Sequence, residues 1–538
     1  MFYLALNSLG HHLSSDCQES GKPTRWTLVL LSPACFLCSY EMSAPNDNLR
    51  CYLLFSSSVT TWFSGMGNMK LLCVWAVLLW GTCSAVQTGR EFITTFMQNY
   101  LGTSADTLLE LEIISYEEAT TVTVSVNQNP LRKVLVLGKD QTASVKLPNF
   151  LQLKGNTHTL FTVIITSSKD ISVVSVNKRS YTMDAALIYP VSALGNEYYI
   201  FTPPNKGNSK EFTVINTGEP NTIQIYRVNT RKVQTISLKP YENYQFQSRS
   251  DLSRSRIVSV KPVAVLSGHT CVYYRTKCNH VFEQLPPVSS WGKTFIVAPL
   301  SVQRQFDLIY VLTSKDTEIR FGQGGQKPDR LKAGQMTSYQ ISQSRPLSIT
   351  ASEGIMVMFY CTGGVLSRQF RFDPFLVNVV PVSQYSTGYR FQGRPGFSNF
   401  ANIIARTSDT ARLKMDKKVK LASLKWENIK GTAFSWADLR FSDLKLHSVA
   451  GEAVEPFSLY VYGVTNRDAY GFQASPDAFQ GKSVSLSMLC VHTPQVRVRD
   501  AVKLPLHCVS TLPGQGYRRS KAPSALCVHS PRSGLETQ

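Results

Sequence analysis

A short motif that marks the start of each repeat (the opener) and recurs at a nearly constant interval restricts the possible folds of this chain more than any other feature. Pro-Val-Ser begins at Pro190, Pro287 and Pro381, so the copies stand 97 and 94 positions apart. Each copy is followed by a glycine and an aromatic residue, and Gly89-Arg90-Glu91-Phe92 supplies a matching pair earlier in the chain. Self-similarity at a fixed period is the mark of repeat architectures, so we expect four tandem units.

Short alternating runs rich in Val, Ile, Thr, Tyr and Phe fill each interval. Thr121–Val126 is the clearest run, and it directs Val122, Val124 and Val126 to one face of a strand. No stretch carries the long apolar stripe of 3.6-residue period that an amphipathic helix shows. The sequence therefore predicts an all-β protein.

The arrangement of those strands has two interpretations. About seven short strands per unit, separated by turn residues, are typical of a two-sheet sandwich, and tandem β-sandwich-like repeats of about 95–105 residues are our expectation. The same strands also suit a β-propeller with two blades per repeat. The expected units are residues 86–184, 185–284, 285–378 and 379–483.

A segment before the first unit has the order of a secretory signal peptide. Lys70 precedes an apolar run, Leu71–Trp80, which is followed by the small residues Ser84 and Ala85. The run is shorter than the roughly 20 residues of a transmembrane helix, so we expect a signal peptide over residues 69–85, secretion, and no membrane association.

Both ends of the chain lie outside the repeats. Residues 1–68, upstream of the signal, are expected to be disordered or a gene-model extension. Residues 484–538 repeat a Cys-Val-His/Ser theme rich in Ser, Pro and Arg, as in Cys490-Val491-His492 and Cys527-Val528-His529. Such a composition predicts a low-complexity, disordered tail.

Positive charge is in excess. Lys and Arg outnumber Asp and Glu by 56 to 36, which gives a formal net charge of +20. An excess of this size favours anionic partners, and acidic glycans are the class we expect. The basic residues look scattered along the sequence, so a nucleic-acid partner is not expected, and a charge without a specific use is the alternative.

Catalytic motifs are absent from the sequence. It contains no Gly-x-Ser-x-Gly, no His-Glu-x-x-His and no phosphate-binding Gly-x-x-x-x-Gly-Lys-Ser/Thr. Adjacent carboxylates such as Glu117 and Glu118 point to opposite sides of a strand and make a poor acid–base pair. We expect a protein that is not an enzyme and holds no cofactor.

The most specific stretch lies at the junction of the second and third units. Its distinctive residues are Gly268, His269, Cys271, Cys278, His280, Glu283, Gln284, Pro287, Trp291 and Gly292. In this order they resemble the N-terminal domain of the IgGFc-binding protein family, and the likeness extends over roughly residues 89–480. The resemblance implies a secreted, mucus-associated binding protein.

Partners follow from the resemblance alone. It implies immunoglobulin Fc, a mucin-type glycoprotein or a microbial surface as the partner in mucus. The alternative is a structural mucus component that associates with anionic glycans through its basic surface, without a discrete receptor site. The chain lacks the long cysteine-rich von Willebrand factor D-type assemblies of the family's full architecture, so covalent cross-linking of mucus is not expected.

Three cysteines lie within the repeats. Cys271 and Cys278 are expected to form a disulfide across a hairpin in an oxidising compartment. With His269 and His280 they also make the ligand set of a structural zinc site, but a spacing of one residue places His and Cys on opposite faces of a strand, so no metal is expected. Cys361 is expected to be a buried free thiol, with an intermolecular bridge as the alternative.

Trp291 has two interpretations as well. An exposed tryptophan beside a glycine is a common platform for a ligand, whereas a tryptophan at the start of a repeat packs between neighbouring units. We expect packing.

Overall fold

The computed structural model describes Gln87–Asp477, apart from residues 101–106, 205–207, 229, 231, 275–276, 323–327 and 368–369. Three short antiparallel strands belong to a separate unit, β1 (Leu30–Leu31), β2 (Leu37–Glu41) and β3 (Arg50–Leu54). The expectations for residues 69–85 and 484–538 fall outside the described residues, as does most of residues 1–68.

Strands dominate the described chain. Its regular elements are β-strands and one-turn 3-10 helices, which confirms the all-β class. In β6 (Thr120–Val126) every second residue is buried, and Val122, Val124 and Val126 are buried as the period of two predicts, together with Thr120. Among the residues described, no helix is long and apolar enough to cross a membrane.

One long strand organises the first unit. This strand, β10 (Val163–Arg179), takes part in two half-sheets, one along its first half and the other along its second half. The pairing register with β4 (Gly89–Thr94) shifts between Thr166 and Ile171, where β10 passes from one half-sheet to the other. The first half-sheet contains β4, β6 and β7 (Arg132–Leu137). The second contains β5 (Leu108–Ser115), β8 (Thr142–Leu147) and β11 (Thr182–Ile188).

The second and third units repeat this plan. Their long strands are β17 (Arg256–Tyr274) and β24 (Leu347–Cys361). The strands of the first half-sheets are β12 (Gly195–Tyr199), β14 (Asn221–Tyr226) and β15 (Val233–Leu238), then β19 (Gly292–Val297), β21 (Thr317–Phe321) and β22 (Asp329–Leu331). The strands of the second half-sheets are β13 (Lys210–Asn216), β16 (Asn243–Ser248) and β18 (Lys277–Gln284), then β20 (Asp307–Thr313), β23 (Met336–Ile341) and β27 (Phe375–Val379).

The fourth unit divides the long strand in two. β34 (His447–Gly451) and β35 (Ser458–Thr465) take the places of its two halves, and Pro456 lies between them. β17 of the second unit stays continuous across Pro262, so a proline alone does not explain the division. The first half-sheet contains β28 (Gly388–Phe391), β30 (Leu413–Met415) and β31 (Val419–Lys420). The second contains β29 (Ser398–Arg406), β33 (Phe434–Phe441) and β36 (Asp468–Gln473).

The two half-sheets of a unit enclose one apolar core. In the first unit Phe92, Val124 and Ile165 from one half pack in a common cluster with Leu111 and Val173 from the other. Consecutive strands such as β5 and β6 lie in different halves, so the chain builds a sandwich-like unit before it begins the next. The last strands β11 and β27 run to Ile188 and Val379, past the ends expected for their units.

The recurring proline and glycine meet at each junction. Pro190, Pro287 and Pro381 each precede a 3-10 turn with φ of −65°, −65° and −68°. Each proline lies against the opener glycine of the preceding unit, because a Cβ on Gly89, Gly195 or Gly292 would come within 2.6, 2.5 and 2.2 Å of the proline Cβ. The glycine therefore has to lack a side chain so that the next proline can pack on it.

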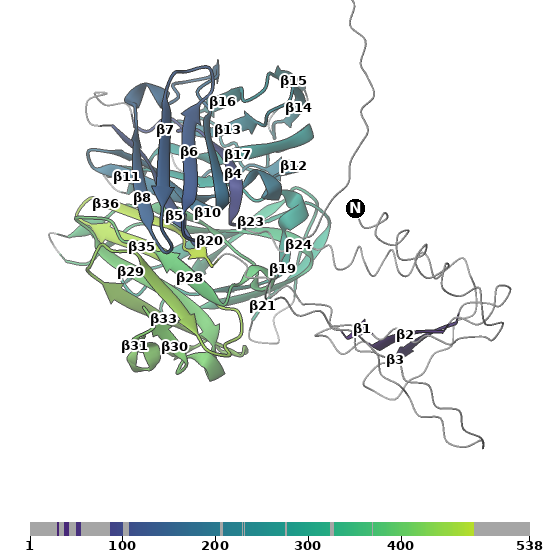
Figure 1. Cartoon of the computed structure of the whole chain (residues 1–538), viewed down its shortest axis with the longest axis vertical. Coiled ribbons are helices and arrows are strands. Elements are labelled where there is room, and N and C mark those ends of the chain that lie inside the picture. The colour runs from purple at the N-terminus through teal and green to yellow at the C-terminus, as the bar shows by residue number, and fades with distance from the viewer. Residues whose placement is uncertain are drawn as a thin grey trace, which may run out of the picture. The chain divides into compact units, whose positions relative to one another are not determined.

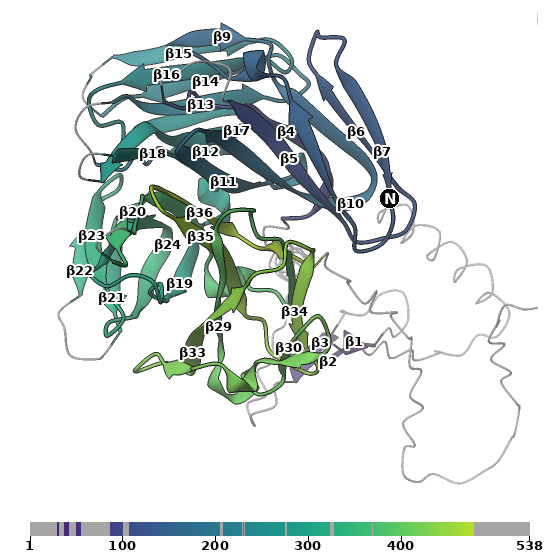
Figure 2. The ribbon, with the colours of Figure 1, turned by 90° about the vertical axis from the view of Figure 1, so that its left-hand side faces the viewer.

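The units follow one another around a single compact body, and the fourth returns to the first (Figure 2). Val174, Val176 and Met183 of the first unit share an apolar cluster with Tyr389 and Phe472 of the fourth. Figure 1 shows β36 beside the strands of the first unit. The array is therefore closed into a ring rather than extended, which the expected row of tandem sandwiches did not include.

Candidate functional site

The last strands of the four units, β11, β18, β27 and β36, meet at the centre of the ring. Asp184 on β11 is fully buried there. Its Oδ1 accepts the N–H groups of Ala185 (2.9 Å) and Gly471 (3.4 Å), and its Oδ2 accepts those of Phe282 (3.2 Å) and Leu376 (3.4 Å). One carboxyl group thus binds backbone from all four units.

Asn279 on β18 makes the complementary set of bonds. Its Nδ2 donates to the carbonyl oxygens of Met183, Pro374 and Ala469, each at 2.8 Å. Its Oδ1 accepts the N–H of Met183 at 2.7 Å. Because a primary amide has two donor hydrogens, three carbonyl groups share them. Asp184 and Asn279 together form the hub that ties the units to one another.

Two residues of the family-like stretch extend this hub. The Oε1 of Glu283 accepts the N–H of Asn378 at 3.1 Å, and the Oε1 of Gln284 accepts the N–H of Tyr189 at 3.1 Å. Asn378 in turn donates through Nδ2 to the Tyr189 hydroxyl at 2.8 Å. Burial raises the pKa of the Asp184 and Glu283 carboxyls well above their usual range. Both side chains are buried and accept hydrogen bonds from the backbone of neighbouring units, so they do not face solvent.

The two histidines are buried between the first and second units. The Nδ1 of His280 lies 3.1 Å from the carbonyl oxygen of His269, and its Nε2 lies 3.3 Å from the Nδ2 of Asn177. Burial lowers the pKa of both histidines to about 3. Glu211 lies 4.0 Å from His280, but burial raises the pKa of its carboxyl well above the usual value. Both histidines are therefore neutral at pH 7, and burial disfavours the charged form of Glu211.

Cys271 and Cys278 are joined by a disulfide that links β17 to β18, with the Cα atoms 5.2 Å apart. The Nδ1 of His269 accepts the N–H of Cys271 at 3.1 Å, so this histidine supports the same hairpin. Among the residues that the structure describes, no group of three or more His, Cys, Asp or Glu is arranged to hold a metal ion.

The other residues of the family-like stretch also lie in packed positions. A Cβ on Gly268 would stand 2.0 Å from the carbonyl oxygen of Val281, so only glycine allows β17 and β18 to approach there. Trp291 packs on the core of the second and third units, 5.8 Å from the ring of Tyr199, and its Nε1 donates to Pro286.

Cys361 is a buried free thiol, and burial raises its pKa well above the ordinary value.

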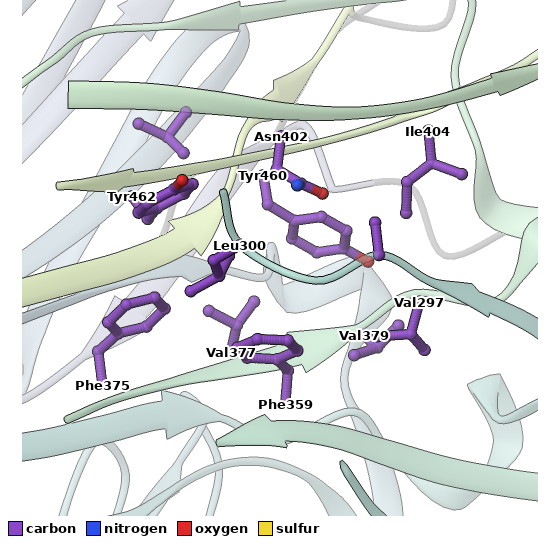
Figure 3. A pocket seen from close by; sticks show the side chains of 12 residues that line it. Val297, Leu300, Phe359, Phe375, Val377, Val379, Asn402, Ile404, Tyr460 and Tyr462 are labelled. Atoms are coloured by element: carbon purple, nitrogen blue, oxygen red, sulfur yellow. The ribbon is translucent and has the colours of Figure 1, made fainter. Parts of the chain in front are cut away.

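A small cavity lies at the junction of the third and fourth units (Figure 3). It is lined mainly by apolar side chains, among them Val297, Phe359, Val377 and Ile404. The polar atoms beside it are already bonded, since the Tyr460 hydroxyl accepts the N–H of Val380 at 2.9 Å. Its volume of about 30 Å³ is too small for an organic ligand.

The sequence analysis singled out neither Asp184 nor Asn279, although a signal for them exists. Asp184, Asn279, Asp373 and Asp468 stand 95, 94 and 95 positions apart, each in or next to the last strand of a unit. A polar residue that returns with the period of the repeat, inside otherwise apolar strands, indicates a shared interior role.

Two comparisons with known proteins show the family of this chain. A family model described as IgGFc binding protein matches residues 184–463, a span that begins at Asp184 and includes Asn279, Glu283 and Gln284. The chain is also 32% identical over 425 residues to a human protein named IgGFc-binding protein. That match covers 75% of this chain and 8% of the human protein, so the chain spans a small part of that relative's length.

Proposed function

Because the chain belongs to the IgGFc-binding protein family, we propose that it is a secreted, non-enzymatic binding protein that engages immunoglobulin G through the Fc portion. The observation that carries this proposal is the family match across the central hub. The name of the human relative states the partner, and the family match spans the hub residues Asp184 and Asn279 of this chain.

The physical character of the molecule supports a binding role. Its buried acids and histidines are engaged by backbone and amide groups inside the ring, so they are not offered to a substrate. A scaffold whose parts are tied together in this way presents its surface loops in fixed positions, which lowers the entropy lost on binding. The Cys271–Cys278 disulfide fits an oxidising, extracellular compartment.

The test uses the secreted chain on columns that carry immobilised Fc or Fab fragments of immunoglobulin G. We expect retention on Fc at about 0.5 M salt, where screening removes most long-range electrostatic attraction. Equal retention on Fc and Fab, or passage through both columns, would contradict the proposal.

The excess of positive charge favours a second candidate function. A net charge of +20 suits a structural component of mucus that associates with anionic glycans. Binding of this kind is strong at low salt and weakens steeply as ionic strength rises. Retention on a sulfated polysaccharide column at low salt, with release by about 0.5 M salt, is the expected behaviour.

A further inference from the structure

The positive charge of the fourth unit gathers on one edge hairpin. Between Arg412 and Lys430 the chain carries seven Lys or Arg residues against two acidic ones. The basic residues are Arg412, Lys414, Lys417, Lys418, Lys420, Lys425 and Lys430. The hairpin formed by β30 and β31 lies at the far end of the fourth unit from β6 and β14 (Figure 1).

Local acids are already engaged around this hairpin. Asp416 accepts the N–H of Ser448 at 2.8 Å through Oδ1, and its Oδ2 lies 2.9 Å from the Nδ1 of His447. Lys445 lies 3.1 Å from Asp443. Asp416 therefore fixes the tip of the hairpin against β34, and its side chain stays 28% exposed.

Three lysines of this hairpin stay open to solvent, and one of them, Lys417, interacts electrostatically with Asp477. Lys417, Lys418 and Lys420 are exposed, and none of them forms an ion pair within the part of the chain that the structure describes. Lys417 and Lys418 also line an open hollow of about 390 Å³, together with Val419, Lys445 and one acidic residue, Asp416. The tip thus presents several cations around a depression that a chain of anionic groups can enter.

The equivalent hairpin of the third unit, β21 and β22, shows the contrast. There Lys332 pairs with Asp316 at 2.7 Å, Lys315 with Glu353 at 3.6 Å, and Arg330 with Glu318 at 3.6 Å. The same position in the repeat is electrically balanced in the third unit and unbalanced in the fourth. The hairpin of the third unit therefore serves as a charge-paired reference for that of the fourth.

We propose that the lysine hairpin, residues Leu413–Lys425 with Lys445, is a binding site for an acidic glycan, a polysaccharide that carries sulfate or carboxylate groups. This site rests on the second candidate function and gives it a location. Lysine supplies point charges that suit separate sulfate or carboxylate groups without a bidentate geometry. Leu413–Lys425 contains no aromatic residue on which a nucleic-acid base could stack.

The experiment compares two triple variants with the wild-type chain on heparin. Lys417→Gln/Lys418→Gln/Lys420→Gln removes three charges from the lysine hairpin, and the matched control Lys315→Gln/Arg330→Gln/Lys332→Gln removes three from the third unit. We expect the first variant to lose heparin affinity at least about tenfold and to elute at lower salt. We expect the control to elute with the wild type, and circular dichroism and thermal melting verify that both fold.

The other outcomes separate the site from the function. An equal loss of affinity in both variants overturns the site but leaves glycan association through the overall charge. Absence of wild-type binding to heparin at low salt overturns the second candidate function together with the site. Tighter wild-type binding to duplex DNA or to phosphatidylserine vesicles than to heparin overturns the choice of an acidic glycan.

Discussion

The side-chain amides of Gln87 and Gln473 form a reciprocal pair, in which each Nε2 donates to the other's Oε1 over 2.8 Å. Both side chains are buried, and they join the first strand region of the first unit to the last strand of the fourth. Tyr116 strengthens the same junction by donating to the carbonyl oxygen of Pro476 at 2.7 Å. These contacts close the ring, and several consequences follow from that closure.

The buried ion pair across this junction is expected to be sensitive to the loss of one partner. Arg394 of the fourth unit lies 2.5 Å from Glu112 of the first, and both side chains are largely buried. Arg394→Met strands a carboxylate in the interior, so we expect a loss of about 3–5 kcal/mol in the free energy of unfolding, measured by urea denaturation.

The double variant Arg394→Met/Glu112→Gln removes the stranded charge and is expected to recover part of that loss. The exposed pair of Lys332 with Asp316 serves as the matched control, and Lys332→Met is expected to cost no more than about 1 kcal/mol. Similar losses at both pairs would show that the closing contact does not contribute to stability as argued.

Replacing Asn279 tests the hub. Asn279→Leu has a similar volume but leaves the N–H and C=O of Met183 and the carbonyl groups of Pro374 and Ala469 without these partners. Each buried polar group that loses its bond costs roughly 1–3 kcal/mol, so we expect a drop in stability of at least about 3 kcal/mol. Gln305→Ala, an exposed substitution, is the control, and a change at Asn279 no larger than this control would disprove the role of the hub.

Acid stability is expected to depend on His280. Its pKa is lowered to about 3 in the folded chain and is about 6.5 when unfolded, so the unfolded state gains a proton first as the pH falls. Stability contributed by the neutral histidine is therefore present above about pH 6.5 and is lost toward pH 3, by up to about 1.4 kcal/mol per pH unit.

His280→Gln removes the group that binds a proton on unfolding, and it keeps a polar side chain beside Asn177. The buried carboxyls of Asp184 and Glu283 have raised pKa values and act in the opposite direction, but they are common to both proteins. Urea unfolding between pH 4.5 and 7 is expected to show a shallower acid loss for the variant. Parallel curves would mean that His280 does not titrate on unfolding.

The parts of the fold that sequence predicts are those with a local pattern. The alternation in Thr121–Val126 identifies β6 and its buried face, because a strand's side chains alternate with a period of two. The Pro-Val-Ser openers locate the junctions because the same turn and the same glycine contact recur at each of them. The weak fourth copy reflects a real difference, since two strands, β34 and β35, replace the long strand there.

The closure of the ring and the hub have no comparable local signal. Gln87 and Gln473 lie 386 positions apart, and nothing in either neighbourhood indicates the other. Asn279 sits within the family-like stretch, but its role depends on Pro374 and Ala469, which reach it through tertiary packing. The sequence also does not single out the lysine hairpin as a site, because the partners of the nearby acidic residues are known only from the three-dimensional structure.

Hydrogen exchange across the whole described chain tests the closed ring most directly. A ring whose four units share cores and a central hub unfolds as one body, so the most protected amides of β5, β13, β20 and β29 are expected to exchange with the same free energy of opening and to lose protection together in denaturant. Loss of protection in the first or the fourth unit at a lower denaturant concentration, while the second and third stay protected, would contradict the closed ring.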